Sequence, residues 1–64
     1  MNEELKKTWE DAQKLAISEY AEEFYIEPEI AEECWYEELD KYEREDRVFT
    51  AYFNLCKERG LKPY

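Results

Sequence analysis

Apolar residues recur at steps of three and four along the start of the chain, which places them on one face of a helix. The series consists of Leu5, Trp9, Ala12, Ala16, Tyr20 and Phe24. Asn2 precedes the series and is a favoured N-cap residue, and Glu3 and Glu4 suit the positive end of the helix dipole. Ile26-Glu27-Pro28 ends it, because the α region is disfavoured for a residue before proline. The pattern predicts a helix over about residues 3–25.

Two more apolar series follow Pro28, a residue that fits the first turn of a helix. The first predicts a helix over about residues 28–44 and consists of Ile30, Ala31, Cys34, Trp35, Leu39 and Tyr42. The second predicts a helix over about residues 47–59 and consists of Val48, Phe49, Tyr52, Phe53, Leu55 and Cys56. Gly60 is a strong stop signal, since glycine readily adopts the left-handed conformation that closes a helix. The sequence therefore predicts an all-α fold, a small three-helix bundle, in a single acidic helical domain over residues 1–64.

The segment that joins the second and third predicted helices, residues 43–47, contains no glycine or proline. Asp46 is a candidate N-cap for the third helix. Without a break in this segment, one helix would run over residues 28–59 and expose many aromatic side chains. The alternative fold is therefore a helical hairpin with one long second helix, which would dimerise to cover them.

A break near residue 45 also predicts how the second and third helices are aligned. The two helices would fold back on each other, with Cys34 level with Cys56 and the basic Arg59 beside Glu32. This arrangement would permit a disulfide, which the sequence neither requires nor excludes. We expect two reduced core thiols, since free cysteine is among the most buried residue types and cytoplasmic disulfides are rare.

The charge of the chain is strongly negative and unevenly distributed. The chain has 64 residues and a net charge of −9, and its 44% hydrophobic content argues against disorder. Residues 19–46 hold thirteen acidic side chains against two bases, Lys41 and Arg44. A protein this acidic is repelled by nucleic acid and by anionic membranes. We expect it to bind basic protein surfaces instead.

Catalytic and metal-binding chemistry is not indicated. The chain has no histidine, which removes the usual general base and the commonest zinc ligand. Its single glycine, Gly60, rules out a glycine-rich phosphate loop. Its single serine, Ser18, lacks the Asp-Ser-Leu context in which acidic carrier proteins attach a prosthetic group. We expect no enzyme activity, metal or cofactor, and we expect a cytoplasmic location because no signal peptide or apolar run of about 20 residues is visible.

The acidic residues of the second predicted helix are the main candidate for function. A charge run is most often a solvated helix surface, but Glu29–Glu33 and Glu33–Glu37 are like-charge pairs that each destabilise a helix by about 0.2–0.5 kcal/mol. Carboxylates four residues apart are separated by a rise of about 6 Å. This separation is close to that of neighbouring phosphates on one nucleic-acid strand. Such a row can imitate a nucleic-acid backbone and release counterions as it enters a basic groove.

We therefore expect a non-enzymatic inhibitor that acts as a DNA mimic toward a basic nucleic-acid-handling protein, such as a nuclease or a defence effector. In size, charge and helicity the chain resembles small phage-encoded DNA mimics, among them anti-restriction and anti-CRISPR proteins, and acidic immunity proteins that inhibit nucleases. The resemblance covers no motif, and it implies the host cytoplasm as the location if the protein is phage-encoded. The expected partner-binding residues are Glu19, Glu22, Glu23, Glu29, Glu32, Glu33, Tyr36, Glu37 and Asp40.

Two alternatives belong to other classes of function. A small structural or assembly protein would act as a homodimer, as the long-helix hairpin implies. A transcription-associated adaptor would dock through an aromatic face formed by Phe49, Tyr52 and Phe53. The sequence does not identify the partner for any of the three.

Overall fold

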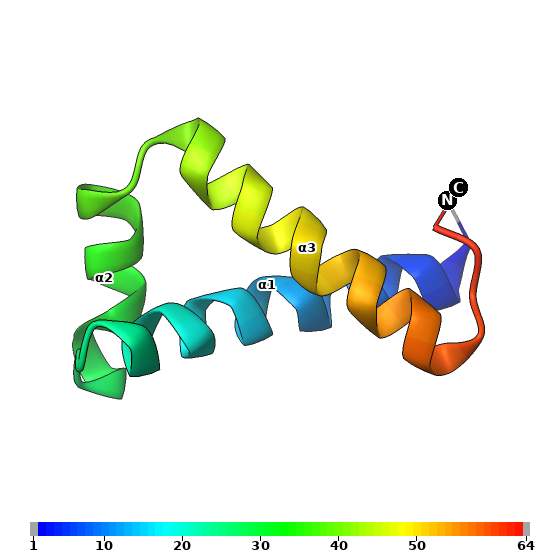
Figure 1. The fold of residues 1–64 in the computed structure, drawn as a ribbon, viewed down its shortest axis with the longest axis horizontal. Helices are drawn as coiled ribbons and strands as arrows, with labels where there is room; N and C mark the ends of the chain where they lie inside the picture. The colour runs from blue at the N-terminus through cyan, green and yellow to red at the C-terminus, as the bar shows by residue number, and fades with distance from the viewer. Residues whose placement is uncertain (1, 64) are drawn as a thin grey trace.

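The structure, a computed structural model, describes residues 2–63 and consists of three helices in this range (Figure 1). They are α1 (Glu3–Glu23), α2 (Pro28–Glu38) and α3 (Lys41–Arg59). The predicted all-α three-helix bundle is confirmed. The first and last positions of the predicted domain lie outside the described residues.

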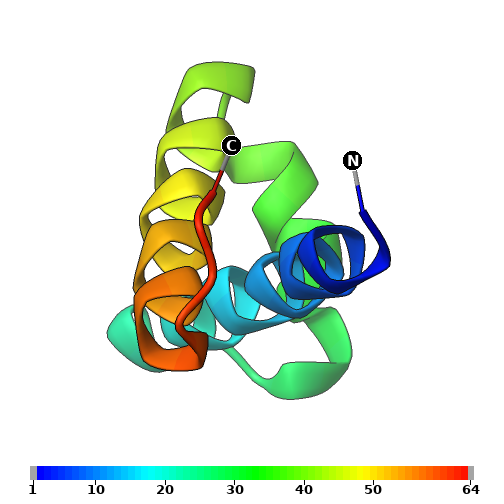
Figure 2. The ribbon, with the colours of Figure 1, turned by 90° about the vertical axis from the view of Figure 1, so that its right-hand side faces the viewer.

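Helix α1 is the base on which the other two helices pack, and α2 and α3 contact α1 far more than they contact each other. Helix α2 stands across the C-terminal end of α1, and α3 then runs back over α1 toward its start (Figure 1). The start of α1 and the segment after α3 therefore lie at the same end of the molecule (Figures 1 and 2). This arrangement leaves much of α2 facing away from the rest of the protein.

The break between α2 and α3 lies at Leu39 and Asp40, several residues before the predicted join. Leu39 is extended, and the Asp40 carboxylate accepts a hydrogen bond from the Glu43 N–H at 2.8 Å, which caps α3. The Arg44 guanidinium donates hydrogen bonds to the carbonyls of Tyr36 and Leu39, which satisfies the C-terminal end of α2. These contacts explain why a break needs neither glycine nor proline here.

Four predictions about this region were therefore wrong. The second helix ends at Glu38 instead of about residue 44, and the third begins at Lys41 instead of about residue 47. Asp46 lies inside α3 and caps nothing. The single helix over residues 28–59 is absent, because the Asp40 cap competes successfully with continuation of α2.

The core lies mainly between α1 and α3 and extends to α2 through aromatic contacts. Small side chains, Ala12, Ala16 and Ala51, let α1 and α3 approach closely. The ring of Trp35 from α2 packs edge-on against Tyr20, with ring centroids 5.6 Å apart. Burial is the main factor that raises the pKa of the Tyr20 and Tyr52 hydroxyls above their ordinary value of 10.0.

The predicted alignment of α2 with α3 was also wrong. Arg59 lies near the start of α1, where its guanidinium contacts Asp11 at 2.9 Å and the Thr8 hydroxyl at 3.0 Å. Cys56 is buried, whereas Cys34 is only partly buried, and both are free thiols. The alignment differs from the prediction because of the position of the turn. Helix α3 starts early enough to pack along α1, so it does not fold back along α2.

The ends of α1 and α3 share one hydrogen-bond pattern but differ in the residue that closes it. The N–H groups of Ile26 and Leu61 each donate to the carbonyl five residues earlier, both at 2.8 Å. The pattern needs a left-handed residue just before the donor. In α3 this residue is Gly60 (φ 69°), but in α1 it is Tyr25 (φ 57°). The left-handed conformation costs a non-glycine residue about 1–2 kcal/mol.

Replacement of Trp35 by alanine tests the orientation of α2. Trp35 is 3% exposed, so Trp35→Ala should lower the free energy of unfolding by about 3–5 kcal/mol. This loss is comparable to the whole stability of a domain this small, about 3–10 kcal/mol. The neighbouring Tyr36 is 59% exposed, and Tyr36→Ala should cost less than about 1 kcal/mol. Urea unfolding followed by circular dichroism measures both, and similar losses would contradict this orientation.

Candidate functional site

Helix α2 presents an acidic row on the side that faces away from α1. Glu29, Glu33 and Glu37 are exposed at successive four-residue steps, which separates the first from the last by a rise of about 12 Å. Tyr36 projects beside the row, and the Arg44 guanidinium lies over its ring at 5.2 Å from the centroid. The opposite side of α2 carries the buried Ala31 and Trp35. The core contact of α2 therefore directs the row to the outside.

The carboxylates of α2 have no basic partner. From Glu27 to Glu38 the chain has six glutamates and no lysine or arginine. Among residues 2–63, none of these six takes part in an ion pair. By contrast, every ion pair that is found joins carboxylates of α1 or α3 to bases of α3. Uncompensated charge is therefore concentrated on α2.

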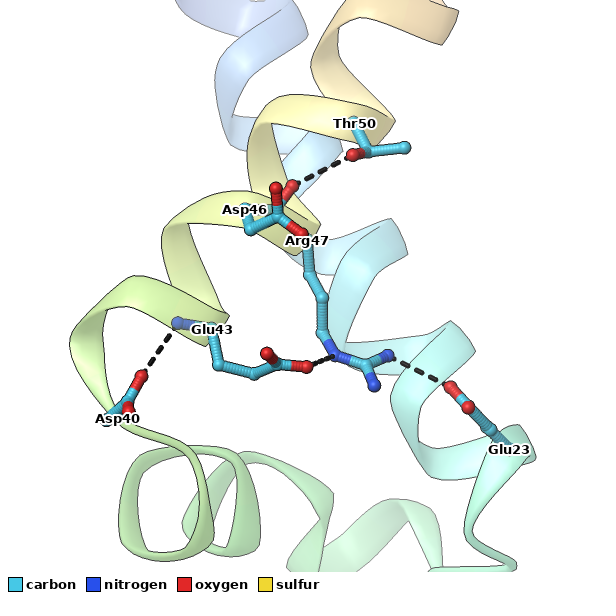
Figure 3. A network of polar contacts seen from close by, with 6 residues as sticks. All are labelled: Glu23, Asp40, Glu43, Asp46, Arg47 and Thr50. Atoms are coloured by element: carbon cyan, nitrogen blue, oxygen red, sulfur yellow. Dashed lines mark hydrogen bonds and ion pairs between the residues drawn. The ribbon is translucent and has the colours of Figure 1, made fainter.

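Glu23, expected in the partner-binding set, instead takes part in the packing of α3 on α1 (Figure 3). The Arg47 guanidinium donates to the Glu23 carboxylate at 3.0 Å and to the Glu43 carboxylate at 3.1 Å. It also lies over the rings of Tyr20 and Phe24, 5.7 and 5.8 Å from their centroids. The hydrogen bond to Glu23 is the largest factor that raises the pKa of Arg47, with the bond to Glu43 adding to it.

Asp40 lies outside the acidic row. The sequence placed it on the acidic side of the second helix, but the helix ends at Glu38. The Asp40 carboxylate faces the first turn of α3, where it accepts the Glu43 N–H (Figure 3). Its position is therefore explained by capping.

The remaining predicted residues lie on different sides of α1. Glu19 lies on the side of α1 that faces α3, beside Asp46 and Arg47. Glu22 lies on the other side, where it and Glu32 of α2 line the same groove. The nine residues thus form an outer row on α2 with Tyr36, a pair at a groove, and three residues near α3.

An open groove of about 660 Å³ lies between the C-terminal half of α1 and the start of α2. Its apolar surface comes from Ile17, Ala21, Ile26 and Ala31. Tyr25 also lines it, with 96% of its surface exposed. Helical periodicity shows which side chains share a face, but it does not show how α2 crosses α1. The groove could therefore not be found from the sequence.

The aromatic face expected for an adaptor is only partly present. Tyr52 is buried, and its hydroxyl donates to the Pro63 carbonyl at 2.9 Å. Phe49 and Phe53 remain exposed at 44% and 47%, with stacked rings 6.1 Å apart. Trp9 of α1 contacts Phe49 edge-on.

No group of acidic or cysteine side chains within residues 2–63 is arranged to hold a metal ion. No helix in the same range is both long and apolar enough to cross a bilayer. Comparison of the chain with protein-family models, curated proteins and solved structures gives no match. The geometry and charge of the surface are thus the basis for a proposal about function.

Arg47 offers a test of the contacts between α1 and α3. Arg47→Met keeps the aliphatic stem but removes the hydrogen bonds to Glu23 and Glu43, and it should lower the free energy of unfolding by about 1–2 kcal/mol. The control is Lys41→Met, which removes a 4.0 Å pair with Glu45 from an exposed site and should cost less than about 0.5 kcal/mol. Urea unfolding at low salt compares the two, and equal losses would show that Arg47 does not link the helices.

Proposed function

We propose that the protein is a non-enzymatic inhibitor that binds the basic groove of a nucleic-acid-handling protein, such as a nuclease or a defence effector, as a DNA mimic. The observation that carries this proposal is the row Glu29, Glu33 and Glu37, which is exposed and has no basic partner within residues 2–63. The resemblance in size and charge to anti-restriction and anti-CRISPR proteins agrees with it. The proposed location is the cytoplasm, where such targets act.

The repulsion within the row supports binding to a cationic surface. Each like-charge pair at four-residue spacing destabilises the free helix by about 0.2–0.5 kcal/mol. A partner whose lysines and arginines lie between these carboxylates removes the repulsion and releases counterions from its own surface. Complementary charge also accelerates the encounter of two proteins, which benefits an inhibitor that competes with nucleic acid.

Tyr36 gives the acidic row a neighbouring anchor. Tyrosine is enriched among the residues that dominate binding energy at protein interfaces. Its ring is 59% exposed, and the contact with Arg44 restricts its position before binding. The proposed primary surface is therefore Glu29, Glu33, Tyr36 and Glu37, without Glu23 and Asp40, whose carboxylates already have partners.

Charge reversal on the row tests the proposal. The protein is immobilised and a panel of basic nucleases, restriction enzymes and polymerases is passed over it at increasing salt concentrations. A genuine target should bind more weakly as salt rises and should be displaced by double-stranded DNA. Glu33→Lys combined with Glu37→Lys should weaken this binding by about tenfold or more, which corresponds to about 1.4 kcal/mol.

The matched control is Glu10→Lys combined with Glu58→Lys, which changes the net charge equally at exposed positions of α1 and α3. This control should weaken binding by less than about threefold, since it alters only the long-range field. Affinity that is independent of salt, or equal losses in the two double variants, would refute recognition by the row.

Self-association is a second candidate function, favoured by the exposed pair Phe49 and Phe53. Such self-association does not require the long second helix of the alternative fold. Burial of this pair between two copies should produce a dimer whose fraction rises with concentration in sedimentation velocity experiments. Phe53→Ser should abolish that rise and leave the helical circular dichroism signal intact. A wild-type protein that sediments as a monomer over about 10–500 µM would exclude a dimer of useful affinity.

A further inference from the structure

Tyr25 is an aromatic residue in a position that disfavours it. It occupies the left-handed site that closes α1, and Gly60 occupies the equivalent site of α3. The Tyr25 side chain is 96% exposed, so its packing within the chain does not offset the backbone strain. A strained residue whose side chain does little for the fold indicates a role in binding. Tyr25 is also one of the residues that line the groove between α1 and α2.

The groove has an apolar interior between two acidic side chains. Ala21 and Ala31 are buried beneath it, and the small size of their side chains leaves the volume of about 660 Å³ open. That volume lies within the range of about 300–1,000 Å³ that is typical of ligand-binding pockets. Glu22 of α1 and Glu32 of α2 also line the groove, and neither takes part in an ion pair within residues 2–63.

The charged side chains around the groove indicate what kind of segment can bind in it. A wholly apolar segment would leave Glu22 and Glu32 without partners, and an acidic segment would be repelled. Among residues 2–63, Lys14 is the only basic residue that lines the groove. A helical segment with an apolar face and flanking lysines or arginines matches both the interior and the two carboxylates.

We propose that this groove binds a basic amphipathic helix of the partner protein, whose large apolar side chain enters between α1 and α2 and packs against Tyr25. Lysines or arginines of that helix pair with Glu22 and Glu32. The inference rests on the proposed function, because it names the segment of the basic partner that the protein holds. The outer row of α2 then contacts a second part of the same basic surface.

The probe is a short synthetic helix of leucine and lysine with its leucines on one face. A second peptide carries serine in place of leucine at the same net charge, and a third carries glutamate in place of lysine. The leucine–lysine peptide should bind at least about fivefold more tightly than either control. Its binding should shift the methyl resonances of Ala21 and Ala31 in NMR spectra of the protein.

Tyr25→Gly separates binding from folding. Because glycine relieves the left-handed strain, this variant should unfold at a higher temperature than the wild type. It should nevertheless bind the leucine–lysine peptide at least about fivefold more weakly, since the ring that would pack against the bound helix is missing. A loss of affinity in a more stable protein cannot be attributed to unfolding. Unchanged peptide affinity in Tyr25→Gly, or equal affinity for the leucine and serine peptides, would overturn the proposal.

The outer-row variant distinguishes failure of the groove from failure of the proposed function. Glu33→Lys combined with Glu37→Lys leaves the groove intact and should keep the preference for leucine over serine. If that preference persists while no basic nucleic-acid-handling protein binds, the groove is supported and the proposed function is wrong. If such proteins bind through the row but Tyr25→Gly changes neither their affinity nor that of the peptide, the groove proposal alone is wrong.

Discussion

The turn at Leu39 and Asp40 determines how the rest of the protein is arranged. The Asp40 carboxylate caps α3, and the Arg44 guanidinium donates to the carbonyls of Tyr36 and Leu39, so polar backbone groups at both helix ends gain partners. Without this turn α2 would continue away from the core. With it, α2 stands across the end of α1 and α3 runs back along α1 (Figure 1). The outward acidic row follows from the burial of Ala31 and Trp35 on the opposite side of α2, and the groove lies at the end of α2 that is remote from this turn.

The charged side chains of the α1–α3 contact differ from those of α2. Arg47 and Arg59 both lie on α3, and both join it to carboxylates of α1 at opposite ends of the contact. No lysine or arginine lies in α2, so its glutamates stay uncompensated although the chain has bases elsewhere. Two arginines of α3 thus help to hold α1 and α3 together. The excess negative charge gathers on the helix that contributes least to this contact.

The number of helices and several of their ends could be predicted from the sequence, because these depend on local signals. Asn2 caps α1, Pro28 opens α2 and Gly60 closes α3, as their residue types indicate. The break after Glu38 was misplaced because Asp40 and Asp46 are both suitable cap residues, and residue type alone does not choose between them. Long-range packing brings Glu22 and Glu32 to one groove and places Glu23 against Arg47. The apolar periodicity of a single helix does not show which side chains of different helices come together.

The two closing residues, Tyr25 and Gly60, show how stability and binding can be separated within one motif. The hydrogen bonds at both helix ends are alike, so both positions require a left-handed backbone conformation. Glycine adopts this conformation with less strain than tyrosine. At the end of α3 the chain has glycine, and nothing lies within 4 Å of where a side chain would begin. At the end of α1 it has a tyrosine that the fold neither needs nor covers. Because the motif is the same, the difference between the two positions lies in their surroundings: only Tyr25 borders the groove, where an aromatic ring has something to contact once a partner is bound.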